Sequence, residues 1–179
     1  MLKHKSRYNI PNNKILELGS GCGLSGLTCA KEYNCKQVFL TDINLHVLSN
    51  LQQNVNINDL TTKITVSCLD FYNNIINDQA LPINDIDLII AADIICKEDD
   101  AIALSKFLHM FLKPNSLAII VSAKEKHRFG VSIFAKECRK IGLDVFVETL
   151  VCENDQMIQY ASGYVVDMEF YLFHVRRFD

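Results

Sequence analysis

The sequence predicts an α/β fold of three layers, in which helices flank a mostly parallel sheet of seven strands. Three observations support this prediction. Apolar runs of strand length alternate with helical patterns along the whole chain. The run 86–95 is apolar except for Asp87 and Asp93, as expected of a central parallel strand that is covered on both faces. The first apolar run ends in a glycine-rich loop that leads into a helical pattern.

The first half of the chain contains two expected strand–helix repeats and two further strands. The glycine loop separates a strand from the first helix, and Asn44 is expected to cap the second helix, in which leucines recur at helical spacing. The expected strands here are 14–18, 37–41, 63–68 and 87–92, and the expected helices are 24–33 and 44–56.

The second half continues the alternation. Pro114 follows the third expected helix and Gly142 closes the fourth. The polar stretch 152–162 between the last two expected strands is too short for a clear crossover helix, so the last strand is expected to run antiparallel. The expected helices are 98–112 and 128–141, and the expected strands are 117–122, 144–151 and 169–175.

Composition limits the class of protein. A length of 179 residues suits a single domain, expected to span residues 1–179 with a short N-terminal segment 1–13. The net charge of −3 gives no electrostatic support for nucleic-acid binding, and neither a signal peptide nor an apolar run of membrane-spanning length is found. Seven cysteines without a C-x-x-C pair indicate reduced thiols and a cytoplasmic or nuclear protein, and scattered histidines predict no metal site.

The glycine loop and the end of the second strand predict a nucleoside-containing cofactor. The loop lies within Ile-Leu-Glu-Leu-Gly-Ser-Gly-Cys-Gly, residues 15–23, and the second strand ends in Thr41 and Asp42. Glycines let a backbone turn sharply and approach a ligand that a Cβ atom would block. A carboxylate at Asp42 can accept hydrogen bonds from ribose hydroxyls, although it could also cap the following helix.

Two cofactors compete for this loop. Gly21, Gly23 and Gly26 match the G-x-G-x-x-G pattern of dinucleotide-binding proteins. The acid Glu17, two residues before Gly19, fits S-adenosylmethionine (SAM) better, because the SAM amino group needs an acceptor whereas a pyrophosphate needs donors. The short chain also leaves little room for the second half of a dinucleotide enzyme. SAM is therefore favoured, with a dinucleotide as the alternative.

In order along the chain, these motifs resemble the Rossmann-like, seven-strand class I SAM-dependent methyltransferases. Leu69-Asp70-Phe71 and Ala91 to Cys96 are similar to methyltransferase family 16, which includes protein-lysine methyltransferases such as the calmodulin-lysine enzyme. The resemblance implies that the loop surrounds the methionine part of SAM, that Asp42 and Ile43 hold ribose and flank adenine, and that Asp70 and Phe71 bind adenine. It implies a catalytic mouth at Ala92 and Asp93, although Asp93 could instead cap the helix that begins near Glu98. The loop residues are Glu17, Gly19, Ser20, Gly21 and Gly23.

The resemblance implies an enzyme that methylates a lysine side chain of a protein partner. Phe71 replaces the tryptophan usual in the subgroup, and Cys96 replaces a tyrosine. Nucleic-acid bases are disfavoured as substrates, because the segment from Asp93 to Cys96 lacks the prolines and the aromatic residue of base amino-methyltransferases. A small-molecule methyltransferase and a non-catalytic partner protein of the same fold are the alternatives. The charged stretch 124–128 is interpreted as a solvated turn. Tyr160, Tyr164 and His174 are interpreted as core residues, with the lining of a substrate groove as the alternative.

Overall fold

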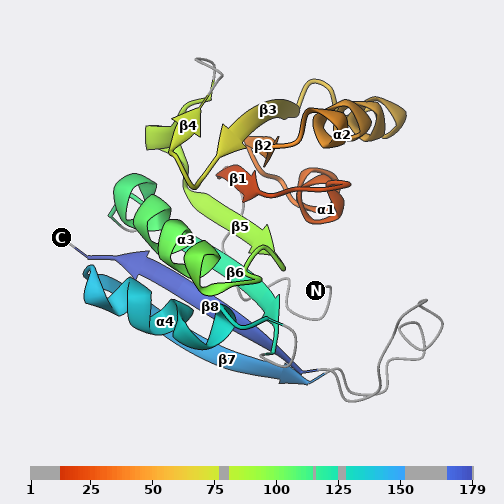
Figure 1. The fold of residues 1–179 in the computed structure, drawn as a ribbon. Helices are drawn as coiled ribbons and strands as arrows, with labels where there is room; N and C mark the ends of the chain where they lie inside the picture. Colours follow the sequence, from red (N-terminus) through yellow and green to blue (C-terminus); the bar gives the residue numbers. More distant parts are fainter. Residues whose placement is uncertain (1–12, 77–80, 115, 125–127, 152–168, 179) are drawn as a thin grey trace. The chain divides into compact units, whose positions relative to one another are not determined.

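The computed structural model describes residues 13–76, 81–114, 116–124, 128–151 and 169–178 (Figure 1). The chain divides into two compact units, Met1–Ile90 and Ala91–Asp179. Strand β5 (Leu88–Ala92) carries the chain from the first unit into the second. The single domain over residues 1–179 stays a prediction.

The first unit is built on a mostly parallel sheet with the strand order β4-β3-β2-β1. Strand β2 pairs in parallel with β1 on one side and with β3 on the other, and β4 pairs antiparallel with β3. The 3-10 helix η2 precedes β5. The elements are β1 (Lys14–Leu18), α1 (Leu24–Glu32), β2 (Gln37–Asp42), α2 (Leu45–Ile57), β3 (Ile64–Asp70), β4 (Ile75–Ile76) and η2 (Ile83–Asp85).

The core of the first unit forms where α1 packs on β1 and β2 and where α2 packs on β2 and β3. Strand β1 is an apolar run that is almost wholly buried, and Leu51 and Val55 give α2 its buried stripe. Burial of these side chains supplies the main stabilising free energy of the unit. The fully buried apolar side chains of this unit include Ile15, Leu16, Leu18, Val38, Leu40, Leu51 and Val55.

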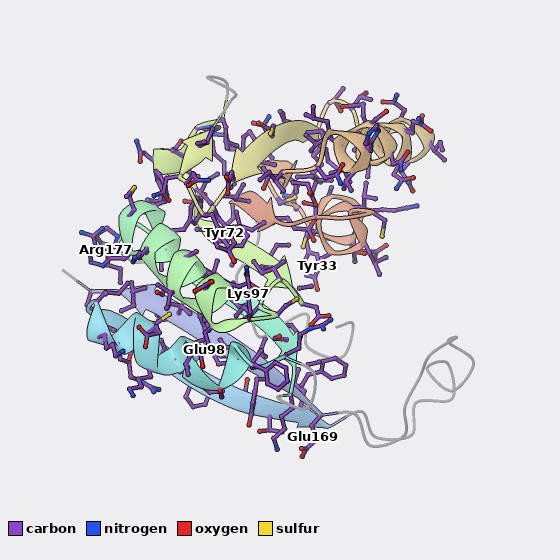
Figure 2. The ribbon with its side chains drawn as sticks, in the orientation of Figure 1. Tyr33, Tyr72, Lys97, Glu98, Glu169 and Arg177 are labelled. Atoms are coloured by element: carbon purple, nitrogen blue, oxygen red, sulfur yellow. The ribbon has the colours of Figure 1, made fainter. Side chains whose placement is uncertain are left out.

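Helix α1 is held at both ends by side chains from the sheet. Its N-cap, Gly23, has no side chain to offer, and a Glu17 carboxylate oxygen accepts the Gly26 N–H instead, at 3.1 Å. At the other end, Lys63 Nζ donates to the carbonyls of Ala30 and Tyr33 at 2.7 and 3.1 Å, where Tyr33 follows the helix (Figure 2). An acid at the first turn and a base at the last turn complement the helix dipole.

The second unit contains the strands β6 (Leu117–Ala123), β8 (Glu169–Arg177) and β7 (Leu143–Val151), in the order β6-β8-β7. Strand β8 runs antiparallel to both neighbours. Helices α3 (Glu98–Phe111) and α4 (Val131–Lys140) lie side by side in this unit (Figure 1). Helix α4 packs on the sheet partly through Phe134, whose ring meets that of Phe173 edge-on at 5.1 Å.

The predicted α/β fold, with a mostly parallel sheet and an antiparallel last strand, is confirmed. Each expected helix and strand is present, with ends shifted by at most a few residues. Two elements were not predicted: β4 has only two residues and η2 three, too few to show a period. The stretch 152–162 lies outside the described residues. None of the helices that the structure describes has the length and hydropathy to span a membrane.

Gly26→Ala is expected to destabilise the chain by about 1 kcal/mol or more, although alanine favours helices over glycine by a similar amount. An added Cβ would lie 2.1 Å from Leu40 Cδ2 and 2.7 Å from Glu17 Oε2, so the buried Leu40 and Glu17 side chains, or α1 itself, would have to shift. Urea unfolding measures the change, with the exposed Lys31→Ala in the same helix as the control. A stabilised Gly26→Ala chain would contradict this packing.

Candidate functional site

The glycine loop between β1 and α1 has the conformation of a ligand-binding turn. Gly19, Gly21 and Gly23 have φ values of 59°, 54° and 84°, in the left-handed region that side chains disfavour. A Cβ on Gly23 would lie 2.4 Å from Leu51 Cδ1, so that glycine is fixed by packing. Gly21 differs: apart from Gly21 itself and its two neighbours in the chain, no described atom lies within 4 Å of the position that its Cβ would take. A ligand can therefore approach the backbone of this loop at Gly21.

Hydrogen bonds tie the loop to the end of β2. The Ser20 N–H donates to the Thr41 carbonyl at 2.8 Å, and the Thr41 N–H donates to Ser20 Oγ at 2.9 Å. Thr41 Oγ1 also donates to the Glu17 carbonyl at 2.6 Å. Thr41 and Ser20 are buried, so these bonds are shielded from water and set the distance between the loop and β2.

Asp42 lies directly beside the glycine loop. Its Oδ2 accepts the Gly21 N–H at 3.2 Å and its Oδ1 accepts the Asn44 N–H at 3.0 Å. The cap of α2 is Asn44, whose Oδ1 accepts the His46 N–H at 2.9 Å. The predicted Asn44 cap is confirmed, and Asp42 does not take that role. Each carboxylate oxygen of the half-buried Asp42 keeps a further lone pair, which is what a ribose hydroxyl needs.

Glu17 is an acid almost wholly enclosed by the first unit, with 3% of its surface exposed. Burial raises the pKa of its carboxyl to about 7, although hydrogen bonds from the Gly26 amide and from the Ser20 and Ser25 side chains act in the opposite direction. Neutral hydrogen-bond donors offset only part of the free-energy cost of burying this carboxylate, so a bound cation would stabilise its charged form. The interaction of Glu17 with the amino group of SAM stays a prediction.

Ile43 follows β2, whereas Asp70 ends the neighbouring parallel strand β3 and Phe71 follows it. Because Asp42 pairs with Cys68 in this register, they emerge at the same sheet edge. Ile43 is 61% exposed, and Asp70 accepts the Tyr72 N–H at 2.8 Å in a tight turn. The rings of Phe71 and Tyr72 lie 5.2 Å apart, and Tyr72 is exposed beyond β3 (Figure 2). Their binding of adenine stays a prediction.

In the second unit, Asp93 follows Ala92, the exposed last residue of β5. Its backbone has a φ of 58°, which is strained for a residue other than glycine, and its N–H donates to the Val121 carbonyl at 2.7 Å. Its carboxylate accepts Arg128 Nε at 2.9 Å and Nη2 at 2.6 Å. This bidentate pair raises the pKa of the Arg128 guanidinium. The alternative role as a cap of α3 is not seen, because Asp100 accepts the N–H groups of Cys96 and Lys97 there.

Three residues that shape these regions were missed by sequence reasoning. The sequence includes Thr41 only as part of a motif, gives no role to Asn54, and suggests a solvated turn for Arg128. In the structure Thr41 bonds the loop, Asn54 donates from α2 to the Cys22 carbonyl at 2.9 Å, and Arg128 donates to Asp93. A polar residue on the helix stripe next to Leu51 and Val55 was the available signal for Asn54.

The two described ends of the charged stretch 124–128 form ion pairs in the second unit. Lys124 Nζ lies 2.6 Å from Glu169 Oε2, at the start of β8 (Figure 2), and 5.6 Å from the centre of the Tyr171 ring. Arg128 pairs with Asp93. Both ends stay partly exposed, at 41% for the Lys124 side chain and 31% for that of Arg128, and residues 125–127 lie outside the described residues, so the solvated turn stays a prediction. His174 stacks on Phe146 at 5.7 Å, whereas Tyr160 and Tyr164 lie outside the described residues.

Several solved structures of similar fold are methyltransferases by name. A TehB-like SAM-dependent methyltransferase of Corynebacterium glutamicum has a TM-score of 0.65 at 19% identity, over 94% of this chain and 82% of that one. A protein of Galdieria sulphuraria described as a putative sarcosine dimethylglycine methyltransferase has a TM-score of 0.69 at 13% identity, over 93% of this chain and 79% of that one. The [4+2]-cyclase SpnF has 0.70 at 12%, over 94% and 76%. The fold is thus that of the Rossmann-like methyltransferases, and the cyclase shows that this fold also serves another reaction.

The sequence comparisons are more specific. The model of the lysine methyltransferase family matches residues 1–139, and the chain belongs to that family. It is 28% identical over 131 residues to the calmodulin-lysine N-methyltransferase of Arabidopsis thaliana, covering 73% of this chain and 43% of that protein. An uncharacterized protein of Dictyostelium discoideum is 31% identical over 160 residues, covering 75% and 44%. The chain spans less than half the length of these two relatives.

The family and its fold make SAM the cofactor, and the first unit fits this ligand. The open space beside Gly21 admits a ligand against the loop backbone. Asp42 retains acceptor capacity for the ribose, and the buried Glu17 offers an acid for the amino group. The described residues contain no group of three or more histidine, cysteine or acidic side chains that could hold a metal ion.

Glu17→Gln is expected to stabilise the chain at pH 8 and to change little at pH 4. The folded-state pKa of about 7 lies above the ordinary glutamate pKa of 4.5, so the folded state binds the proton more tightly. Stability therefore falls as pH rises from about 4.5 to 7, by an amount on the order of 3 kcal/mol, and the amide removes this cost. Urea unfolding at both pH values measures it, with Glu32→Gln at the exposed end of α1 as the control. Equal differences at the two pH values would contradict the raised pKa.

Asp42→Asn is expected to weaken SAM binding by about tenfold or more, because two ribose hydroxyls would lose a charged acceptor. Asparagine can still accept the Asn44 N–H, so the turn into α2 should persist. Calorimetric titration with SAM measures the affinity, and Asp59→Asn, beyond the end of α2, is the matched control. Unchanged affinity would refute the ribose assignment.

Proposed function

We propose that this chain carries out SAM-dependent methylation of a lysine side chain in a protein. Its membership of the lysine methyltransferase family supports the reaction class. The observation that carries the proposal for the acceptor is the position of the Asp93 carboxylate, directly after β5. The backbone of Asp93 has a positive φ, and its carboxylate accepts two hydrogen bonds from Arg128. Strain and fixed geometry of this kind concentrate at functional positions.

The chemistry asks little of the protein beyond alignment. When bound, SAM supplies a methyl group that its sulfonium has already activated. A lysine acceptor must first lose a proton, because its ordinary pKa is about 10.4. We propose that Asp93 orients the amine by accepting a hydrogen bond from it while water removes the proton. The carboxylate thus acts through position, as expected where proximity and orientation lower a barrier.

The acceptor protein and the location are further parts of this proposal. The relative from Arabidopsis thaliana is by name a calmodulin-lysine N-methyltransferase, which favours a protein over a small molecule as acceptor here. Within the described residues, Cys22, Cys29, Cys35, Cys68, Cys96 and Cys138 are free thiols. Reduced cysteines are typical of the cytosol and nucleus, so we propose that the protein works there.

Transfer of tritium from labelled SAM to a cell lysate tests the proposed function. We expect label in protein that a protease releases, and methyllysine after acid hydrolysis. Label confined to the small-molecule fraction would instead indicate a small-molecule methyltransferase. Calorimetric SAM binding without any labelled product would indicate a non-catalytic protein of this fold, and the proposal would fail.

Asp93→Ala is expected to reduce the rate of methyl transfer by about a hundredfold while the dissociation constant of SAM changes by less than about threefold. The side chain is proposed to meet the acceptor and not the cofactor. Tritium transfer at saturating SAM and calorimetry give the two quantities, with Asp99→Ala in the first turn of α3 as the control. A rate equal to that of the unaltered chain would remove Asp93 from the mechanism.

A further inference from the structure

The orientation of the Asp93 carboxylate depends on a side chain 35 residues away. Arg128 donates to both oxygens of this carboxylate, from Nε at 2.9 Å and from Nη2 at 2.6 Å. A guanidinium that binds through two parallel bonds fixes the plane of the carboxylate as well as its position. The backbone of Asp93 is also held, since its N–H donates to the Val121 carbonyl of β6 at 2.7 Å.

Arg128 is itself held against the start of α3. Its carbonyl accepts the Val131 N–H at 3.0 Å, which closes the turn into α4. Within that turn, Gly130 lies close to Lys97, the residue before α3, which Figure 2 labels. A Cβ added to Gly130 would be 2.0 Å from the Lys97 carbonyl oxygen. The turn therefore cannot move toward α3, which limits the positions from which it can present the guanidinium.

Folding stability alone gives little reason for this pair. The side chains of Arg128 and Asp93 are 31% and 46% exposed, and ion pairs with such access to water contribute little to stability. The positive φ of Asp93 adds a modest further cost, which Asp59 and Asn74 also carry in this structure. A defined orientation of the carboxylate, however, is what an aligned acceptor requires.

We propose that Arg128 is a positioning residue for methyl transfer, which fixes the Asp93 carboxylate so that its remaining lone pairs meet the acceptor amine. This inference rests on the proposed function. Two guanidinium bonds leave each carboxylate oxygen with further acceptor capacity, so the amine does not have to displace Arg128. The pair also carries no net charge, so orientation and not attraction of a cation is its contribution. Arg128 touches neither the acceptor nor the cofactor in this proposal.

Substitution of Arg128 tests the role by separating the transfer rate from cofactor binding. Arg128→Met is expected to lower the rate of tritium transfer to lysate protein by about ten- to a hundredfold at saturating SAM. The dissociation constant of SAM and the melting temperature are expected to stay close to those of the unaltered chain. Arg128→Lys should recover only part of the rate, because a single ammonium cannot make two parallel bonds. A transfer rate of Arg128→Met equal to that of the unaltered chain would overturn the proposal.

Two comparisons make this test specific. Arg176→Met is the matched control, because Arg176 is an exposed arginine that lies away from Asp93. Arg176 of β8 pairs with Leu117 at the start of β6, whereas Val121, whose carbonyl accepts the Asp93 N–H, lies near the end of β6. A double-mutant cycle supplies the other: Asp93→Asn with Arg128→Met should be no slower than Asp93→Asn alone. Rate losses that multiply in the double variant would show that Arg128 acts independently of Asp93, and would overturn the inference.

Nuclear magnetic resonance of the arginine side chains separates this inference from the proposed function. In the unaltered chain, the Arg128 Nε–H is expected to exchange with water at least about tenfold more slowly than the Arg176 Nε–H, and Asp93→Ala should abolish the difference. If the unaltered chain transfers no methyl group, the proposed function fails while this measurement still decides whether Arg128 holds Asp93. Equal exchange of the two groups would refute the pair in solution.

Discussion

Three buried hydrogen bonds between the glycine loop and the end of β2 determine the geometry of the cofactor region. They join Ser20 and Thr41 in both directions and fasten the Thr41 hydroxyl to the Glu17 carbonyl. Because they are shielded from water, breaking any of them would leave a buried polar group unpaired. The position of Asp42 beside the Gly21 amide follows from these bonds, since Asp42 is the next residue of the strand. Ser20 and Thr41 thus connect the glycine loop, which the ligand can approach, with the Asp42 carboxylate that is proposed to hold the ribose of SAM.

Glu17 shows how stability and binding oppose each other in the first unit. A leucine in its place would suit the apolar strand β1, and the acid instead carries a cost of burial that raises its pKa to about 7. The cost is partly recovered because its oxygen accepts the Gly26 N–H, where α1 has no cap of its own. The residue is thus both a structural cap and a candidate ligand for a cation. Residues that break a local rule in this way are the ones expected at functional positions.

Local signals in the sequence were sufficient for most of the fold. The start of α1 was predicted because a glycine loop and a helical pattern adjoin, and the Asn44 cap because its residue type and position agree. Strand β4 was missed because its two residues form a strand only by pairing with β3, where Ile76 lies opposite Leu69. Such pairing has no period that a sequence can show.

The candidate site was predictable to a different degree in its two parts. Glycines and acids at strand ends carry a pattern, so the residues of the loop and Asp42 were named from sequence. Arg128 belongs to no such pattern, because its partner Asp93 lies 35 residues earlier and the two meet only once the turn into α4 has formed. The same charged side chain would have suited a solvated turn equally well. Contacts fixed by tertiary structure are the part that residue type and spacing do not encode.

The anchoring of α1 has a consequence for the path of the cofactor. Glu17 holds the first turn of this helix and Lys63 holds its last turn, so the helix is clamped to the sheet at both ends. A helix clamped in this way cannot swing outward to widen the loop without breaking buried bonds at one end. It forms a fixed wall beside the loop, so a ligand that contacts the loop backbone has to approach it at Gly21, where an added Cβ would meet no neighbouring atom within 4 Å among the described residues.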